Sequence, residues 1–589
     1  MKHKEKEKRF LITTALEATW VIDQPVIFLG EWCRLYSRKD IWLGMDAKVT
    51  PYHWSKSEKL CLDYEYVNSL YECLLVKLAE SLNTIHGVDY SNKYWRILIG
   101  PWIANLIHVL YDRWLSITTV KSLYDITGTI FLESNIESSA TNDLLECCEL
   151  MKTDEWNHNI YAEIINSLDI CQPLIKKNYK EQHKISKIKN ESSIKANISK
   201  LYLFVAKYFS RKQDIFFHEA YITKLELVLL QLKLGQFPQL WKPFIPTIAN
   251  YDKELRNFEI KYQAKNEFEK FLLKSIPKHI PRTYLEGYQK LSDQVAKSPW
   301  PKSPKLIYTA NALWAQPVTM AYAAEKVENG TALVYGQHGG GYGVSKFSFS
   351  EEHEIKISRR YLTWGWDSKS ETSLIPAGIG KIPKIKRKKS KEYNTLLMIT
   401  LNASRYSFRL GSETTRNFLD YFEDYFSFTS LLQDNIKNNM VVRLTNWDQG
   451  WSQPLRWKDK FPDVKLELQN RDIYKLISES RIVVHTYNST GILETLSMGI
   501  PCIIFYDLKN MPLRDSAIPY FEELKQVGIF HDNPISAAAH IDSIWNNVDL
   551  WWTSNKVQKA VLNFNKRYCH NVKSISSTIK SILKEIIKE

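Results

Sequence analysis

The chain has 589 residues, of which 44% are hydrophobic and 24% charged, and its net charge is +14. This length exceeds one hydrophobic core, so two or three domains are expected, and the composition excludes a disordered chain. The positive charge favours anionic partners such as nucleotide phosphates or anionic lipid head groups. No nucleic-acid partner is expected, because no recognised nucleic-acid motif accompanies the charge.

The eight cysteines are scattered and form no CxxC pair, so no zinc site is expected and a reducing, cytoplasmic compartment fits best. The charged N-terminus, MKHKEKEKRF, is followed by no long apolar region, which argues against a signal peptide. The most apolar later run, residues 97–110, is too short to span a bilayer and contains Asn105 and His108.

Two short apolar runs near the N-terminus, residues 10–14 and 26–30, predict the first two strands. Each leads into a loop that carries a carboxylate, Glu17 after the first strand and Glu31 after the second. Since both loops can lie on one face of a sheet, either carboxylate is a candidate general base for an acceptor hydroxyl. The alternative for each is a helix cap or a surface charge.

Residues 120–300 show helical patterns and few convincing strands, which predicts a large helical insertion. Within this range, residues 176–200 are rich in Lys, Ser and Asn and are expected to be exposed. Residues 1–119 and 301–380 are then interpreted as the two parts of one N-terminal Rossmann-like domain.

A glycine-rich turn follows the strand predicted at residues 332–335 and reads GQHGGGYG from Gly336. Five glycines in eight residues permit close backbone approaches or positive φ, and no Gly-Lys-Ser/Thr follows, so this is not a P-loop. His338 is well placed to meet a phosphate or a sugar carboxylate, with Gln337 and Gly339 beside it. The alternative is a flexible turn with an incidental histidine.

Residues 381–391 hold seven basic residues in eleven, which predicts a linker over 381–392. A second alternation of strands and helices follows and predicts a C-terminal Rossmann-like domain over 393–589 with a basic helical tail. Arg405 follows the first strand of this block and Arg443 lies in the second. A fixed guanidinium at either place could neutralise a leaving phosphate.

The most informative stretch is residues 482–505, IVVHTYNSTGILETLSMGIPCIIF. It predicts a buried parallel strand, a polar turn, a helix that ends at Gly499 and a second buried strand. Ligands of doubly wound sheets bind at the carboxyl ends of the strands, and the free N–H groups of a helix N-terminus favour phosphate. The candidate donor-binding residues in this unit are Asn488, Ser489, Thr490, Gly491 and Glu494. The alternative is an ordinary Ser/Thr cap with a surface glutamate.

Six stretches along the whole chain resemble a family of bacterial transferases encoded with O-antigen and other surface-polysaccharide genes. They are TTALEATW, FLGEWC, YWRILIGPW, GQHGGGYG, TWGW and YNSTGILETLSMGIP. The two alternating blocks also resemble the GT-B glycosyltransferase architecture. These likenesses imply an α/β fold with two Rossmann-like domains facing a cleft, and a transferase activity, but no particular substrate.

The QHG and STG…E…GIP stretches are also similar to those of capsule Kdo transferases and of glycerophosphotransferases that use CDP-glycerol. That likeness implies that His338, Ser489 and Thr490 hold a donor phosphate and that Glu494 binds donor hydroxyls. No DxD-type pair stands out, so neither a metal nor another cofactor is expected beside the nucleotide-activated donor.

The activity expected from these features is transfer of a sugar from a nucleotide-activated donor to a glycan or lipid-linked acceptor. A cytoplasmic location is expected, with peripheral contact to the anionic inner face of the cytoplasmic membrane. One alternative is a CDP-glycerol-type polyol-phosphate transferase. Another, from a different class, is a non-catalytic scaffold that binds a glycan or nucleotide.

Overall fold

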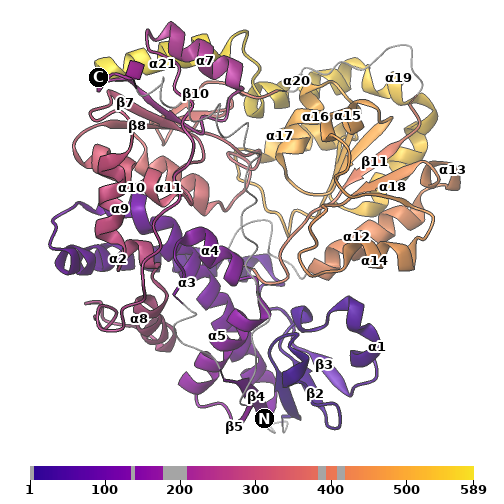
Figure 1. Ribbon diagram of the computed structural model, residues 1–589. Coiled ribbons are helices and arrows are strands. Elements are labelled where there is room, and N and C mark those ends of the chain that lie inside the picture. The colour runs from indigo at the N-terminus through magenta and orange to yellow at the C-terminus, as the bar shows by residue number, and fades with distance from the viewer. Residues whose placement is uncertain (1–5, 134–139, 177–207, 383–392, 408–417) are drawn as a thin grey trace.

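The computed structural model describes residues 6–133, 140–176, 208–382, 393–407 and 418–589. These residues form three parallel β-sheets, each packed against helices (Figure 1). The fold class is therefore α/β, as the sequence predicts. Two of the sheets, the second and the third, face each other across a cavity, and the first sheet is an additional body at the N-terminus.

The first sheet has the strand order β3-β2-β1-β4-β5. Its strands are β1 (Lys8–Ile12), β2 (Val26–Phe28), β3 (Ala47–Val49), β4 (Asp125–Leu132) and β5 (Pro173–Lys176). The long helices α2 (Ser57–His86) and α3 (Asn92–Leu123) connect β3 to β4, and α4 (Leu144–Leu150) and α5 (Asp154–Ser167) connect β4 to β5. The apolar runs of β1 and β2 are buried, as expected for strands covered on both faces.

The second sheet has the order β10-β9-β8-β7-β6. Its strands are β6 (Phe216–His218), β7 (Leu306–Thr309), β8 (Ala332–Gly336), β9 (Arg360–Thr363) and β10 (Leu374–Pro376). The helices α8 (Glu267–His279), α9 (Tyr288–Lys297), α10 (Pro317–Glu328) and α11 (Phe349–Ile357) belong to the same part of the chain. Of these, α10 and α11 pack against the strand β8.

The predicted single N-terminal domain with a helical insertion over 120–300 is wrong. That range supplies β4, β5 and β6 to two different sheets, so residues 1–119 and 301–380 are not halves of one sheet. The strand β6 spans only three residues and β4 contains a glycine, so neither shows an alternating pattern that sequence periodicity can detect. The expected exposed segment over 176–200 lies outside the described residues, apart from Lys176.

The third sheet has the order β13-β12-β11-β14-β15-β16, so strands are added toward one edge from β11 to β13 and toward the other edge from β14 to β16. Its strands are β11 (Leu396–Ile399), β12 (Met440–Arg443), β13 (Lys465–Glu467), β14 (Ile482–His485), β15 (Cys502–Phe505) and β16 (Phe530–His531). Its main helices are α12 (Phe418–Leu431), α14 (Gln453–Lys460), α15 (Ile473–Ser478), α16 (Thr490–Ser497), α17 (Ile518–Gln526) and α18 (Pro534–Ile544). Ligands of such sheets bind where the strand order reverses, so the β11 and β14 ends are the expected site.

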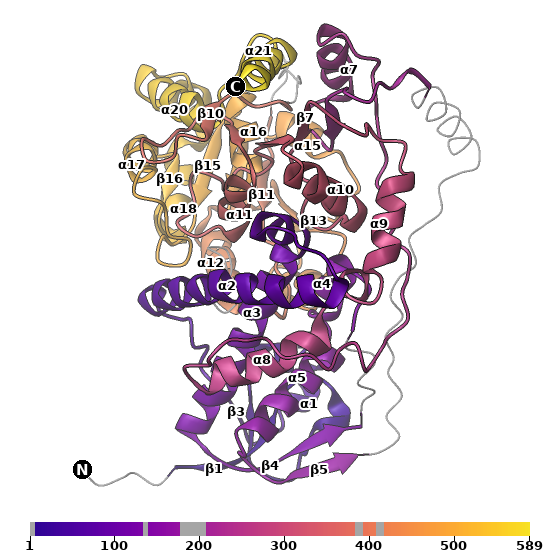
Figure 2. The ribbon, with the colours of Figure 1, turned by 90° about the vertical axis from the view of Figure 1, so that its left-hand side faces the viewer.

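The end of the chain returns to the second sheet. After α20 (Asn555–Tyr568), helix α21 (Ile575–Lys588) packs against α7 (Lys224–Lys233), and both views place these two helices side by side (Figures 1 and 2). Ile579, Leu583 and Ile586 are buried there in a cluster shared with the second sheet. The predicted C-terminal domain therefore ends before α21. Most of the predicted linker lies outside the described residues, which include only its first two positions.

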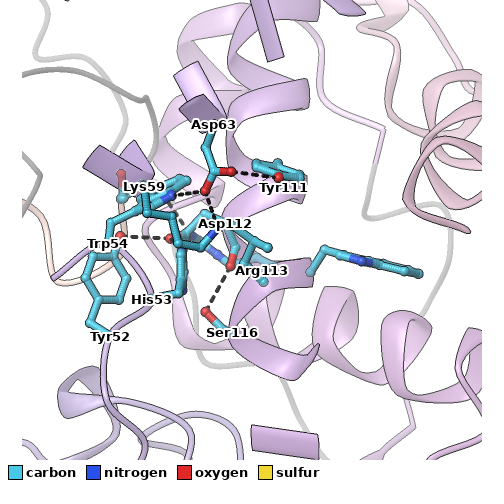
Figure 3. A network of polar contacts seen from close by, with 12 residues as sticks. Tyr52, His53, Trp54, Lys59, Asp63, Tyr111, Asp112, Arg113 and Ser116 are labelled. Atoms are coloured by element: carbon cyan, nitrogen blue, oxygen red, sulfur yellow. Dashed lines mark hydrogen bonds and ion pairs between the residues drawn. The ribbon is translucent and has the colours of Figure 1, made fainter. Parts of the chain in front are cut away.

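Helix α3 lies at the centre of the molecule and contacts α2, α5, α8, α10 and α11. Most of its residues are buried, including the ion pair of Asp112 with Arg113. Tyr52 donates a hydrogen bond to Asp112 at 2.8 Å, and Figure 3 shows the surrounding polar network. Arg113 also donates at 2.7 Å to the carbonyl of Ser407, which joins the first sheet's helices to the third sheet's domain.

Within the described part of the chain, no helix combines the length and the apolar character that crossing a bilayer would require. Helix α3 is the longest and most buried, yet Asp112 and Arg113 lie in it. Its burial is explained by the helices of the first and second sheets that surround it.

Replacing Asp112 with alanine should lower the free energy of unfolding by about 3–5 kcal/mol, because Arg113 would remain buried without its carboxylate. Urea unfolding followed by tryptophan fluorescence would measure this. The matched control is Asp434→Ala, which removes the ion pair of an aspartate that is 92% exposed; it should change stability by no more than about 0.5 kcal/mol. Equal unfolding midpoints for the two variants would contradict this account of the buried pair.

Candidate active site

Two cavities of about 510 Å³ each lie at the carboxyl ends of the third sheet's strands. The glycine-turn cavity lies between Gly339–Tyr342, after β8, and Tyr487–Gly491, after β14. The N-terminal cavity lies between the loops after β2 and β3 and the loops after β11 and β12. Tyr487 lines both cavities, so they are neighbours.

The glycine-rich turn touches the start of α16 directly. The Gly340 N–H donates to Thr490 Oγ1 at 2.9 Å, and Asn488 Nδ2 donates to Ser345 Oγ at 3.2 Å. A Cβ on Gly340 would lie 2.6 Å from the Thr490 Cα, closer than any side chain can approach a backbone atom. Glycine is therefore required here for the close approach of two backbones.

Backbone hydrogen bonds fix the same turn to a further loop of the third sheet's domain. The Lys346 N–H donates to the Pro512 carbonyl at 3.0 Å, and the Arg514 N–H donates to the Val344 carbonyl at 2.8 Å. The Arg514 guanidinium also donates to buried Glu351 on α11 at 2.5 Å. These contacts hold the second and third sheets in a fixed relation around the cavity.

The N-terminus of α16 has the features of an anion-binding site. The Thr490 and Gly491 N–H groups, at the first two helical positions, donate to no group in the described part of the chain. Ser489 is the N-cap residue, but its hydroxyl makes no capping hydrogen bond and is buried without a partner among the described residues. Donors of this kind at a helix N-terminus favour a phosphate or carboxylate.

His338 lines the same cavity and lies against a buried glutamate. Its Nδ1 is 3.7 Å from Glu354 Oε1, and its Nε2 is 3.3 Å from the Tyr342 hydroxyl. Glu354 also accepts hydrogen bonds from Tyr342 at 3.0 Å and from Tyr361 at 3.2 Å. Burial raises the pKa of the Glu354 carboxyl well above its usual range, so this group holds its proton unless a cation forms beside it.

The structure thus brings together six of the predicted site residues: His338, Gly339, Asn488, Ser489, Thr490 and Gly491. Sequence reasoning missed Glu354, because nothing in the segment FSEEHEI separates this glutamate from Glu351 and Glu352 beside it. It also missed Asn105, His108, Asn311 and Trp314, which α3 and the loop after β7 supply to the cavity.

Two other predicted donor-binding residues lie outside the cavity lining. Gln337 is buried, and its amide donates to the Gly339 carbonyl and accepts from the Trp364 N–H and the Trp366 indole, each at 2.8 Å. It therefore holds the glycine turn in place. Glu494 accepts a hydrogen bond from Tyr474 at 2.9 Å, and burial raises the pKa of its carboxyl.

Both predicted phosphate-binding arginines are committed to carboxylates. Arg405 forms a forked ion pair with Asp154 of α5 and donates to the Trp32 carbonyl. Arg443 is paired with Glu467, lines neither cavity and donates to a backbone carbonyl at 2.9 Å. Their predicted contact with a leaving phosphate is not supported, because each would have to abandon a largely buried carboxylate.

The two predicted carboxylate bases do not join His338. Glu17 is 41% exposed, lines neither cavity and pairs with Arg38 at 2.5 Å, which lowers the pKa of its carboxyl. Glu31 pairs with Arg34 and lines the N-terminal cavity instead. They belong to the first sheet, whereas His338 belongs to the second, and the sequence patterns could not separate those two sheets.

The fold and the site define an α/β protein with a cavity between two parallel sheets, lined by the donors at the start of α16 and by His338. The model of the LIC12162 family of transferases matches residues 9–583, and the chain belongs to that family. It is a transferase, which confirms the activity class implied by the sequence. No curated protein matches the chain.

Several solved structures are similar to parts of this chain. Wall teichoic acid polymerase TagF soaked with CDPG is 10% identical over 68% of this chain and 99% of that chain, with a TM-score of 0.30. The pneumococcal O-GlcNAc transferase GtfA with UDP and GlcNAc is 11% identical over 53% and 61%, with a TM-score of 0.34. Anabaena Alr3699/HepE with UDP-glucose is 11% identical over 64% and 100%, with a TM-score of 0.35. TM-scores this low carry no inference about the ligands of this chain.

Replacing Gly340 with alanine should separate the glycine turn from α16 and lower the melting temperature, because the new methyl group would meet the Thr490 backbone. The matched control is Gly339→Ala, whose Cβ would find its nearest neighbour, the Tyr342 ring, at 3.8 Å. The free energy of unfolding of that variant should stay within about 1 kcal/mol of that of the unaltered protein. Differential scanning calorimetry would compare them, and similar losses in both would contradict the proposed close contact.

Proposed function

We propose that this transferase is a glycosyltransferase that moves a sugar from a nucleotide-activated donor to an acceptor in bacterial surface-polysaccharide synthesis. One observation carries the proposal: His338 and the unpaired donors at the start of α16 line one cavity at the carboxyl end of β14. The motif likeness to Kdo and CDP-glycerol transferases supports the same ligand class.

The donor phosphate would lie against the Thr490 and Gly491 N–H groups and the Ser489 hydroxyl. These dipoles are already oriented and would stabilise the negative charge that develops on the phosphate as its bond to the sugar breaks. Arg405 and Arg443 are left out of this proposal, because each is paired with a carboxylate. No metal or other cofactor is part of the proposal; the nucleotide-activated donor is a co-substrate.

His338 would act as the general base. As the acceptor oxygen bonds to the anomeric carbon, the imidazole takes the hydroxyl proton, and the sugar–phosphate bond breaks to release the nucleotide with the bonding electron pair. The imidazolium that forms lies 3.7 Å from Glu354 and would favour ionisation of that carboxyl. This assignment replaces Glu17 and Glu31 as candidates for the base. The predicted contact of Glu494 with donor hydroxyls stays a prediction.

A CDP-glycerol-type polyol-phosphate transferase is the second candidate, because the QHG and STG…E…GIP stretches resemble those enzymes as well. The same groups would then hold a donor whose β-phosphorus, rather than a sugar carbon, is attacked. The chemistry of the leaving group separates the two, since CMP is released from CDP-glycerol and a nucleoside diphosphate from most sugar donors.

Replacing His338 with glutamine should lower the rate of nucleotide release from the true donor by at least about 100-fold, because a proton acceptor is lost. A thermal-shift screen of UDP-, GDP-, dTDP-, CDP- and CMP-linked donors would first identify that donor. Calorimetry should then show unchanged donor affinity in His338→Gln but weaker affinity in Ser489→Ala. Failure of every donor to raise the melting temperature, or full activity in His338→Gln, would refute the proposal.

We further propose a cytoplasmic location with peripheral contact to anionic membrane. Helices α20 and α21 expose several lysines, among them Lys556, Lys559, Lys566 and Lys584, and each near-surface cation adds about 1 kcal/mol to binding. Co-sedimentation with phosphatidylglycerol vesicles at low salt should retain the protein, and changing three of these lysines to glutamate should release it. Equal retention on uncharged vesicles would contradict an electrostatic contact.

A further inference from the structure

We infer that the N-terminal cavity binds an uncharged carbohydrate chain, the acceptor of the transfer, and leads its end past Tyr487 to His338. This inference rests on the proposed function. The cavity has about 510 Å³, within the range of small-ligand sites, and shares Tyr487 with the glycine-turn cavity. A ligand held there would therefore lie next to the proposed transfer site.

The strand ends around this cavity indicate a binding site. Gly30 and Thr50 follow strands of the first sheet, whereas Asn402, Thr445 and Tyr487 follow strands of the third. The carboxyl ends of two separate parallel sheets thus open onto one space. Ligands of doubly wound sheets bind at this end of the strands, and here both sheets contribute.

The charges around the cavity are balanced within the protein. Every charged side chain that lines it has an oppositely charged partner within the described chain. The pairs are Glu31 with Arg34, Asp112 with Arg113, Lys152 with Glu149 and Arg405 with Asp154. An anionic ligand would have to break one of these pairs, so an uncharged ligand fits better.

Four polar groups that line the cavity have no hydrogen-bond partner among the described residues. The Tyr161 hydroxyl and the Trp451 indole N–H are buried without one, and the Ser404 hydroxyl and the Gln449 amide make no bond either. Buried polar groups are almost always satisfied in native proteins, so the Tyr161 hydroxyl and the Trp451 N–H indicate a ligand or ordered water. Hydroxyl-rich ligands supply both donors and acceptors for such groups.

Aromatic rings line the same space. Three of them are Trp32, Tyr52 and Tyr406. The ring centroid of Trp32 lies 6.5 Å from that of Tyr52 and 6.0 Å from that of Tyr406. Rings of this kind offer apolar faces beside polar atoms, which matches the alternating C–H and hydroxyl faces of a sugar. Apolar rings, unpaired hydrogen-bonding groups and balanced charge together specify a neutral glycan rather than a second nucleotide.

The test uses the full-length, fluorescently labelled protein on an array of defined bacterial oligosaccharides, with neutral, uronic-acid and phosphorylated members. The unaltered protein should bind a subset of the neutral members. Ala403→Trp would fill the cavity and lower that binding by at least about tenfold. Gln449→Ala should lower it about fivefold, the effect of one lost hydrogen bond. Ala403→Ser is the matched control and should bind like the unaltered protein.

Donor-induced thermal stabilisation, measured on the same variants, separates this inference from the proposed function. It should be the same in all of them, because the donor would bind in the other cavity; it also shows that each variant is folded. Binding only to acidic members, no binding to the array, or unchanged binding by Ala403→Trp would overturn the inference. Neutral-glycan binding by a protein that no nucleotide-linked donor stabilises would refute the proposed function alone.

Discussion

The contact of Gly340 with Thr490 is the constraint on which the site depends. It places the end of β8, from the second sheet, against the first turn of the helix after β14, from the third. Because a Cβ at Gly340 would overlap the Thr490 backbone, only glycine permits this approach. The anion-binding donors and His338 come from different sheets, and this contact is what makes them one site.

Two buried arginines attach the helices of the first sheet to the domain of the third sheet. Arg405 reaches from the loop after β11 to Asp154 on α5, and Arg113 reaches from α3 to the carbonyl of Ser407. A buried guanidinium is costly unless it is paired and hydrogen-bonded, so these contacts favour one relative placement of the two bodies. This explains why an arginine that follows a strand end, a common place for phosphate binding, is structural in this chain.

The sequence predicts those features whose causes are local. Residues 482–505 carry a buried run, a polar turn, a helical period and a terminating glycine, and the structure confirms each of them. The glycine turn is likewise identified by composition alone. By contrast, Glu354 becomes distinctive only through burial and through Tyr342 and Tyr361, and Asp154 only through an arginine 251 positions away. A partner 251 positions away leaves no local pattern, and the burial of Glu354 depends on how the whole fold packs. The strand β6, with three residues, is too short to show a pattern.

The two cavities differ in the charged and polar groups that line them, and that difference assigns the proposed donor to one cavity and the proposed acceptor to the other. The glycine-turn cavity offers oriented N–H and O–H dipoles, which suit a phosphate whose charge grows as it leaves. The N-terminal cavity offers balanced ion pairs and unpaired polar groups, which suit a ligand that stays uncharged. The charge of a nucleotide would therefore disfavour its binding in the N-terminal cavity and favour its binding in the glycine-turn cavity. Since Tyr487 borders both, the donor and the acceptor would occupy neighbouring cavities without competing for one space.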